Sequence, residues 1–249
     1  MRYLVLSDLH ANLEALDAVL ADADRRAWDQ CVVLGDLVGY GADPNAVLDR
    51  VRERQPSQVI RGNHDKVVSG ITDGAGFNPL ALAAARWTQD NIRPDNLSWL
   101  RELPQGPRPL PDYPELVLCH GSPVDEETYI LDHQTAQEAF DLVAFRFCVF
   151  GHTHYPLTIA VGNGELLVEV PSGEEGGTVR LQSGERYLIN PGSIGQPRDG
   201  NFRPCYLILD TDQPAAEFYR VSYEVEAAMA KITDAGLPAP LALRLSRGV

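Results

Sequence analysis

The sequence has little that would place it in a membrane or in a disulfide scaffold. No window approaches the ~20 apolar residues of a membrane-spanning helix, and the start at Met1 leaves no room for the apolar segment of a signal peptide. The 249 residues include only four cysteines, without a CxxC pair. Each cysteine lies in or beside an apolar run, which favours buried free thiols in a reducing compartment. We therefore expect a cytoplasmic protein with no membrane partner.

Positive charge is also scarce. The chain has 21 lysines and arginines against 35 aspartates and glutamates, a formal net charge of −14. An acidic chain without a basic stripe has no general affinity for nucleic acid or for an anionic membrane surface. A phosphorylated substrate is still compatible with this charge, because bound cations can invert the local potential.

The first 65 residues alternate between two kinds of apolar pattern. Short apolar runs at 3–6, 31–34 and 59–60 indicate strands, and the i, i+3 spacing between them predicts helices at 13–23 and 45–54. This βαβαβ order predicts a largely parallel sheet. The chain shows no internal repeat and no low-complexity linker, so we predict a single domain over residues 1–249.

The rest of the chain is predicted to be mixed. Helices are expected at 79–91, 97–103 and 135–141, strands at 115–119 and 148–150, and a loop over the proline-rich stretch 104–114. The last third alternates apolar and polar residues. It predicts a hairpin of 157–161 with 166–170, further strands at 178–181, 186–190, 205–210 and 217–222 in an antiparallel meander, and a helix at 225–234. These patterns indicate an α/β protein with two sheets.

Five of the predicted strands end in a polar cluster that could bind a metal. Because ligands of open α/β sheets bind beyond the carboxyl ends of the strands, these clusters are expected to converge. Five of the six histidines belong to them, and only His133 lies outside, where we interpret it as a surface residue. The clusters are Asp8-Leu9-His10, Gly35-Asp36, Gly62-Asn63-His64-Asp65, His120-Gly121 and Gly151-His152-Thr153-His154.

Imidazole and carboxylate together suit borderline divalent metals such as manganese, zinc, iron, cobalt and nickel. Asp8 and His10 are two residues apart, so on a loop both can reach one ion, and His152 and His154 have the same spacing. Asp36 has two carboxylate oxygens and could bridge two ions. The residues therefore suffice for a site with two metals.

The ordered set DxH, GD, GNHD, HG and GHTH resembles the calcineurin-like metallophosphoesterase superfamily. The match covers about the first 155 residues, and five motifs in the same order form a much stronger signal than any one of them. Two later motifs extend the resemblance toward the compact bacterial phosphoesterases, Asn190-Pro191-Gly192-Ser193 and Gln196-Pro197-Arg198.

The resemblance implies a fold and a role for each position. The fold would be two mixed β-sheets packed as a sandwich flanked by helices. His64 would act beside the phosphate as general acid or charge stabiliser, with Asp65 orienting it, and Arg198 is either a phosphate contact or a surface residue. One metal would be held by Asp8, His10, Asp36 and His154, and the other by Asp36, Asn63, His120 and His152.

The implied activity is hydrolysis of phosphate esters, as a phosphodiesterase or a phosphomonoesterase. Two divalent ions, manganese first among the candidates, would share a hydroxide that attacks phosphorus in line with the leaving group. The expected partner is a small phosphorylated substrate, with nucleotides among the candidates. The sequence does not choose between monoester and diester.

Other interpretations of the same residues remain open. Asp8 and Asp36 could be helix N-caps, and Asn63-His64-Asp65 could be a turn. A nuclease that acts on short nucleic acids needs the same metal core, although the acidic charge disfavours it. A protein-binding scaffold of the same fold is a weaker alternative, because here His64 and every expected ligand are present.

Overall fold

The fold is described here from a computed structural model that covers residues 1–249. It contains two six-stranded sheets. The first sheet has the order β3-β2-β1-β11-β12-β9, with strands Gln58–Val59, Gln30–Val33, Arg2–Leu6, Cys205–Asp210, Ala215–Arg220 and Gly176–Arg180. The second has the order β4-β5-β6-β10-β7-β8, with strands Arg108–Leu110, Tyr113–Leu118, Phe147–Val149, Arg186–Asn190, Leu157–Gly162 and Glu165–Glu169.

The two sheets bury a common core because successive side chains of a strand point to opposite faces. In β1, Tyr3 and Val5 belong to the cluster that also contains Phe147 of the second sheet. Leu4 and Leu6 of the same strand belong instead to the cluster formed with the helices outside the first sheet. The expected α/β sandwich of two mixed sheets is therefore confirmed.

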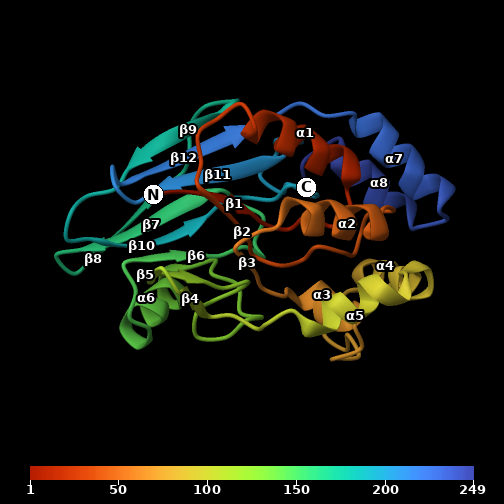
Figure 1. Ribbon diagram of the computed structural model, residues 1–249, viewed down its shortest axis with the longest axis horizontal. Helices are drawn as coiled ribbons and strands as arrows, with labels where there is room; N and C mark the ends of the chain where they lie inside the picture. Colours follow the sequence, from red (N-terminus) through yellow and green to blue (C-terminus); the bar gives the residue numbers. More distant parts are fainter.

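Helices cover the outer faces of this sandwich, as Figure 1 shows. Helix α6 (His133–Leu142) lies beside the second sheet, and the others lie along the first sheet and at one end of the molecule. They are α1 (Leu13–Ala23), α2 (Pro44–Arg54), α3 (Asn63–Val68), α4 (Pro79–Asn91), α5 (Pro94–Glu102), α7 (Val225–Asp234) and α8 (Ala239–Leu245). None of these helices combines the length and the apolar character needed to cross a membrane.

The parallel start of the first sheet is confirmed. Strand β1 pairs in parallel with β2, and β2 with β3, so their carboxyl ends share one edge. In the second sheet β5, β6 and β10 are also parallel neighbours. The carboxyl ends of these strands carry the polar clusters that the sequence singles out.

Four features differ from the sequence-based expectation. The proline-rich stretch 104–114 is not entirely loop, because it contains the bulged edge strand β4 and the beginning of β5. The late strands do not form one meander: β9 pairs with β12 in the first sheet, whereas β10 lies in the second. Two short helices, α3 and α8, were not predicted. Both are too short for a helical period to be recognised in the sequence.

Candidate metal centre

The predicted ligands occupy unusual backbone positions. Asp8, His10, Asp36, His152 and His154 have φ angles of 53°, 48°, 51°, 67° and 63°. This left-handed region costs a non-glycine residue ~1–2 kcal/mol, so it persists only where the surroundings impose it. These five are among nine non-glycine residues with positive φ in the whole chain. Strain concentrated in this way marks a functional site.

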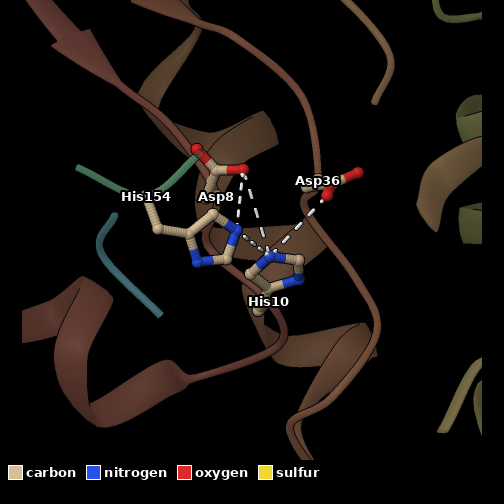
Figure 2. A group of neighbouring side chains, drawn as sticks. All are labelled: Asp8, His10, Asp36 and His154. Atoms are coloured by element: carbon tan, nitrogen blue, oxygen red, sulfur yellow. Dashed lines mark hydrogen bonds and ion pairs between the residues drawn. The ribbon is translucent and has the colours of Figure 1, made fainter. Parts of the chain in front are cut away.

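Four predicted ligands form the first group. Figure 2 shows the rings of His10 and His154 and the carboxylates of Asp8 and Asp36 around a common point. The Nε2 atoms of the two histidines are 3.1 Å apart. The Nε2 of His154 lies 3.3 Å from Asp8 Oδ1, and that of His10 lies 3.6 Å from Asp36 Oδ2. All four residues are buried.

The second group shares Asp36 with the first. It consists of Asp36, His120 and His152, whose ligand atoms lie within 4.8 Å of one another. The Nε2 of His120 is 3.4 Å from Asp36 Oδ2 and 3.1 Å from Asn63 Oδ1, so the amide oxygen of Asn63 belongs to the same cluster. The structure thus brings together all seven residues that the sequence proposed as ligands.

Backbone carbonyls fix the orientation of the imidazoles. The Nδ1 atoms of His10, His120 and His154 lie 3.2, 2.8 and 2.6 Å from the carbonyl oxygens of Val38, Leu34 and Gln196. A carbonyl can only accept, so each Nδ1 carries a proton and each Nε2 is directed into the cluster, where the neutral rings of His10 and His154 present a lone pair. For His152 the roles are exchanged, because its Nε2 lies 3.1 Å from the Glu127 carbonyl.

A divalent cation fits this arrangement. In the first group two imidazole lone pairs and two carboxylates face one another, and in the second the oxygens of Asp36 and Asn63 surround His120 Nε2, whose proton a cation would replace. Acceptors at hydrogen-bond distance with no donor between them repel one another, and a cation removes that repulsion. Buried carboxylates also need a paired charge. The donor set, with imidazole positions fixed by carbonyls, is the one that transition metals take in proteins.

The electrostatics of the group agree with cation binding. Burial lowers the pKa of His10 well below its usual value, which keeps its imidazole neutral. Burial opposes ionisation of Asp36, yet the charge of His120 holds the Asp36 pKa well below its usual value. Burial likewise opposes charge on His120, but Asp36 raises the His120 pKa to about 10. The centre therefore attracts positive charge.

His64 lies beside the two groups without joining them. Its backbone N–H donates to Asp36 Oδ1 at 2.8 Å, and its buried Nδ1 has no hydrogen-bond partner. The ring packs against Tyr40 and Phe77, with centroid distances of 4.4 and 4.6 Å. Burial lowers the His64 pKa to about 4, so the ring is neutral. A neutral imidazole can still donate one hydrogen bond.

Asp65 does not contact the His64 ring. One of its oxygens accepts from the backbone N–H groups of Leu37 and Val38 at 3.0 and 3.3 Å, and the other accepts from Gly62 at 2.9 Å. The carboxylate therefore ties the start of α3 to the loop after β2. The predicted orienting of His64 by Asp65 would therefore act through the backbone of α3, because Asp65 has no hydrogen bond to the His64 ring.

Arg198 reaches the same region from the loop after β10. One Nη donates to Tyr40 Oη at 3.5 Å and to Gln196 Oε1 at 3.3 Å. Its Nε is buried without a partner, and the guanidinium has no ion pair with a carboxylate within 4.0 Å. A partly buried cation with an unpaired N–H is ready to bind an anion. This favours the phosphate contact over the surface interpretation.

The comparisons with known proteins agree with this geometry. Residues 1–214 match the calcineurin-like phosphoesterase superfamily domain. The chain is similar to a metallophosphoesterase from Sphaerobacter thermophilus, at 37% identity over all of both chains with a TM-score of 0.87. It is also 36% identical over 245 residues, 98% of this chain and 97% of the other, to an uncharacterized protein from Methanocaldococcus jannaschii.

The chain belongs to the calcineurin-like phosphoesterase superfamily. It is a metal-dependent phosphoesterase. A hypothetical protein from Pyrococcus horikoshii has the same fold, with a TM-score of 0.78 at 18% identity over all of this chain and 98% of the other.

Two glycines of the phosphoesterase are required by close packing at the centre. A Cβ on Gly62 would lie 2.1 Å from Asp36 Oδ1, and one on Gly151 would lie 2.1 Å from Ser7 Oγ and 2.7 Å from Asp8 Oδ2. Any side chain at either position would displace the carboxylate of Asp36 or of Asp8. Only glycine, which has no Cβ, permits this close packing.

Sequence reasoning missed several residues of the phosphoesterase site. Tyr129 stacks on the ring of His152 with the centroids 3.7 Å apart and 19° between the planes, and Phe77 packs on His64. The carbonyl of Glu127 holds His152. These residues lie on loops outside the five motifs, so only the position of the loop in space reveals their role.

Proposed function

We propose that the phosphoesterase hydrolyses phosphate esters with the help of two divalent cations. The first would be held by Asp8, His10, Asp36 and His154, and the second by Asp36, Asn63, His120 and His152. The observation that supports this most is the sharing of Asp36 between two separate groups of inward-facing acceptors. A single cation would occupy only one of these two groups.

The two cations, when bound, would supply Lewis-acid charge and a hydroxide for in-line attack on phosphorus. The protein's own residues hold and orient the site. Carbonyl oxygens keep three imidazoles with Nε2 directed inward. The backbone bond from His64 to Asp36 Oδ1 fixes the shared carboxylate, so that Oδ2 is the oxygen that faces both groups. Preorganisation of this kind removes reorganisation from the reaction.

The substrate's phosphoryl group would be bound by His64 and Arg198. Each has a buried N atom without a hydrogen-bond partner in the protein. A neutral His64 can donate to a phosphoryl or leaving oxygen, and the guanidinium of Arg198 can neutralise charge on the oxygens that do not react. The fixed position of His64 between Tyr40 and Phe77 suits a group that must meet a defined atom.

The expected substrate is a small phosphorylated molecule, and the expected native metal is manganese. A mixed set of carboxylate, amide and imidazole ligands accepts manganese and also zinc, iron, nickel or cobalt, so metal supply contributes to the choice. A cytoplasmic location is supported by the four cysteines, all of which are buried and free. In an oxidising compartment disulfides would be common.

The proposal is tested by metal reconstitution. The protein is stripped of metal and assayed on generic phosphate monoesters and diesters with manganese, zinc, nickel, cobalt, iron and magnesium in turn. We expect metal-restored hydrolysis, with two ions per chain by elemental analysis. His64→Ala should keep both ions but lose at least ~100-fold in turnover. The control His133→Ala, at an exposed position outside the centre, should behave as the wild type.

A chain that binds no metal, or that hydrolyses no ester with any of these ions, would contradict the proposal. Full activity with one bound ion per chain would contradict the proposal that two cations are needed. The rate ratio of diester to monoester assigns the substrate class.

A further inference from the structure

A cavity of about 380 Å³ opens beside the second metal group. It is lined by the ligand residues Asn63 and His152 and by His64, so an ester whose phosphate is bound at the centre would extend into it. Another part of the wall comes from the segment between α3 and α4, which includes Gly76 and Phe77.

Aromatic rings form much of the cavity wall. Phe77 and Tyr40 each pack on His64, and Tyr129 stacks on His152. Tyr129 is nevertheless 43% exposed, so part of its ring is free to contact a ligand. An aromatic surface beside the expected phosphate position suits a planar ring on the ester, because stacking tolerates many ring types.

The charge of the cavity restricts the ligand further. Two acidic side chains, Asp73 and Glu127, line the cavity, and no lysine or arginine lines it. The two histidines that line it, His64 and His152, have pKa values lowered by burial and are neutral. Glu127 is paired with Lys66, which lies outside the lining. Arg198, which donates to Tyr40 at the edge of the cavity, is assigned to the reacting phosphate. A second phosphate or a carboxylate on the ester would therefore meet Asp73 and Glu127 without a further cationic partner among the lining residues.

We infer that this cavity binds an uncharged planar ring attached to the phosphate ester, and that Phe77 and Tyr129 select it. The inference rests on the proposed function for the position of the phosphate. A nucleobase and a simple aryl group share the required chemistry. The site thereby favours aromatic or nucleoside esters over alkyl esters and over polyphosphates.

Gly76 offers a way to fill the cavity. A Cβ at this position would meet no atom within 4 Å, and its φ lies outside the left-handed region, so a side chain is accepted without backbone strain. Gly76→Leu therefore adds an apolar side chain at a position that lines the cavity. Ala83→Leu is the matched control, because Ala83 is exposed on α4 and does not line the cavity.

The test measures binding of phosphonates, which carry a P–C bond and are not hydrolysed. Calorimetric titration of the metal-loaded protein compares methylphosphonate, phenylphosphonate, 4-carboxyphenylphosphonate and the phosphonate analogue of adenosine 5′-monophosphate. We expect phenylphosphonate to bind about tenfold more tightly than methylphosphonate, and the carboxylated ring to lose that gain. Tighter binding of the adenosine analogue than of phenylphosphonate would identify the ring as a nucleobase.

Gly76→Leu should abolish the preference for the ring and leave methylphosphonate binding unchanged, and Ala83→Leu should keep the preference. Phe77→Leu retains an apolar side chain without the ring and should also reduce the preference, so it serves as the test variant if Gly76→Leu does not fold. Equal binding of methyl- and phenylphosphonate would overturn the inference, even if esters are hydrolysed. Ring-selective binding without hydrolysis of any ester would overturn the proposed function and leave the cavity assignment intact.

Discussion

The substitution Asp36→Asn tests the one carboxylate that the two proposed metal groups share. The Oδ1 atom of Asp36 accepts from the His64 N–H at 2.8 Å, and an asparagine oxygen can keep that bond. Its amide NH2 then replaces Oδ2, which lies 3.6 Å from His10 Nε2 and 3.4 Å from His120 Nε2. The substitution removes one negative charge and points donors at the position where the cations are expected.

The loss should differ between the two groups. The first group keeps the carboxylate of Asp8, whereas the second keeps only Asn63, His120 and His152 and has no anionic ligand left. We therefore expect the metal content to fall from two ions per chain to one or fewer. Turnover should fall by at least ~100-fold, because the charge stabilisation that needs both cations is lost.

Thermal unfolding measures the same loss. A ligand at 100 times its Kd stabilises a protein by ~2.7 kcal/mol, and 1 kcal/mol shifts the Tm of a chain of this size by roughly 2–4 °C. Each bound cation should thus raise the Tm of the metal-free wild type by roughly 5–11 °C. Asp36→Asn should retain at most the shift of one ion.

Asp43→Asn is the matched control. Asp43 lies in the loop after Asp36 and is paired with Lys231 at 2.7 Å, and it is not one of the metal-competent groups. Its substitution should leave the metal content and the metal-induced Tm shift unchanged. If Asp36→Asn bound two ions with the wild-type shift, the argument for a shared bridging carboxylate would be refuted.

Three further outcomes follow from single contacts. Gly39 has a φ of +86° and a Cβ there would lie 2.3 Å from His64 Nδ1, so Gly39→Ala should lower kcat ~10-fold or more at unchanged metal content; wild-type kcat would contradict this. Burial raises the pKa of Asp22, but a hydrogen bond from the Tyr206 hydroxyl outweighs burial and the Asp22 pKa is lowered. Because the folded value lies below the unfolded one, the carboxylate stabilises the fold above its ordinary pKa of 3.8, and this stabilisation is lost as the pH falls through the folded value. Asp22→Asn should therefore cost ~1–3 kcal/mol of unfolding free energy at pH 7 in urea titrations, with a difference that shrinks below pH 3.8. Glu126 is paired with Arg61 and with the buried Lys66, beside the Glu127 carbonyl that contacts His152. Glu126→Gln should therefore weaken binding of the second metal ~10-fold and leave that of the first unchanged; equal weakening of both in a metal titration would argue against it.

Regular elements with strong local signals were predicted well. Helix α1 begins and ends where its apolar period does, and Asn12 caps it by accepting from the Ala15 N–H. Helix α4 has the same kind of cap at Asn78, with a proline at its first position. Helix α3 was missed because Asn63, His64 and Asp65 are turn-forming residues by composition.

The order of the metal motifs also came from the sequence. Each motif follows an apolar strand directly, and parallel strands place their carboxyl ends on one edge. The convergence of the clusters could therefore be proposed without coordinates, and so could the two sheets, whereas the assignment of the seven ligand positions came from the resemblance that the motifs carry. Asp65 was placed correctly near His64, but its bonding to the backbone of the loop after β2 could not be derived from spacing.

Tertiary structure alone decided which atom of each ligand faces inward and what surrounds the substrate. The inward direction of Nε2 on His10, His120 and His154 depends on carbonyl oxygens from distant loops, and carbonyls leave no signature in a sequence because every residue has one. The ring-lined cavity likewise depends on how the segment between α3 and α4 folds back over His64. Local pattern determines strands, helices and motif order, whereas orientation and pocket shape arise only when segments far apart in the chain meet.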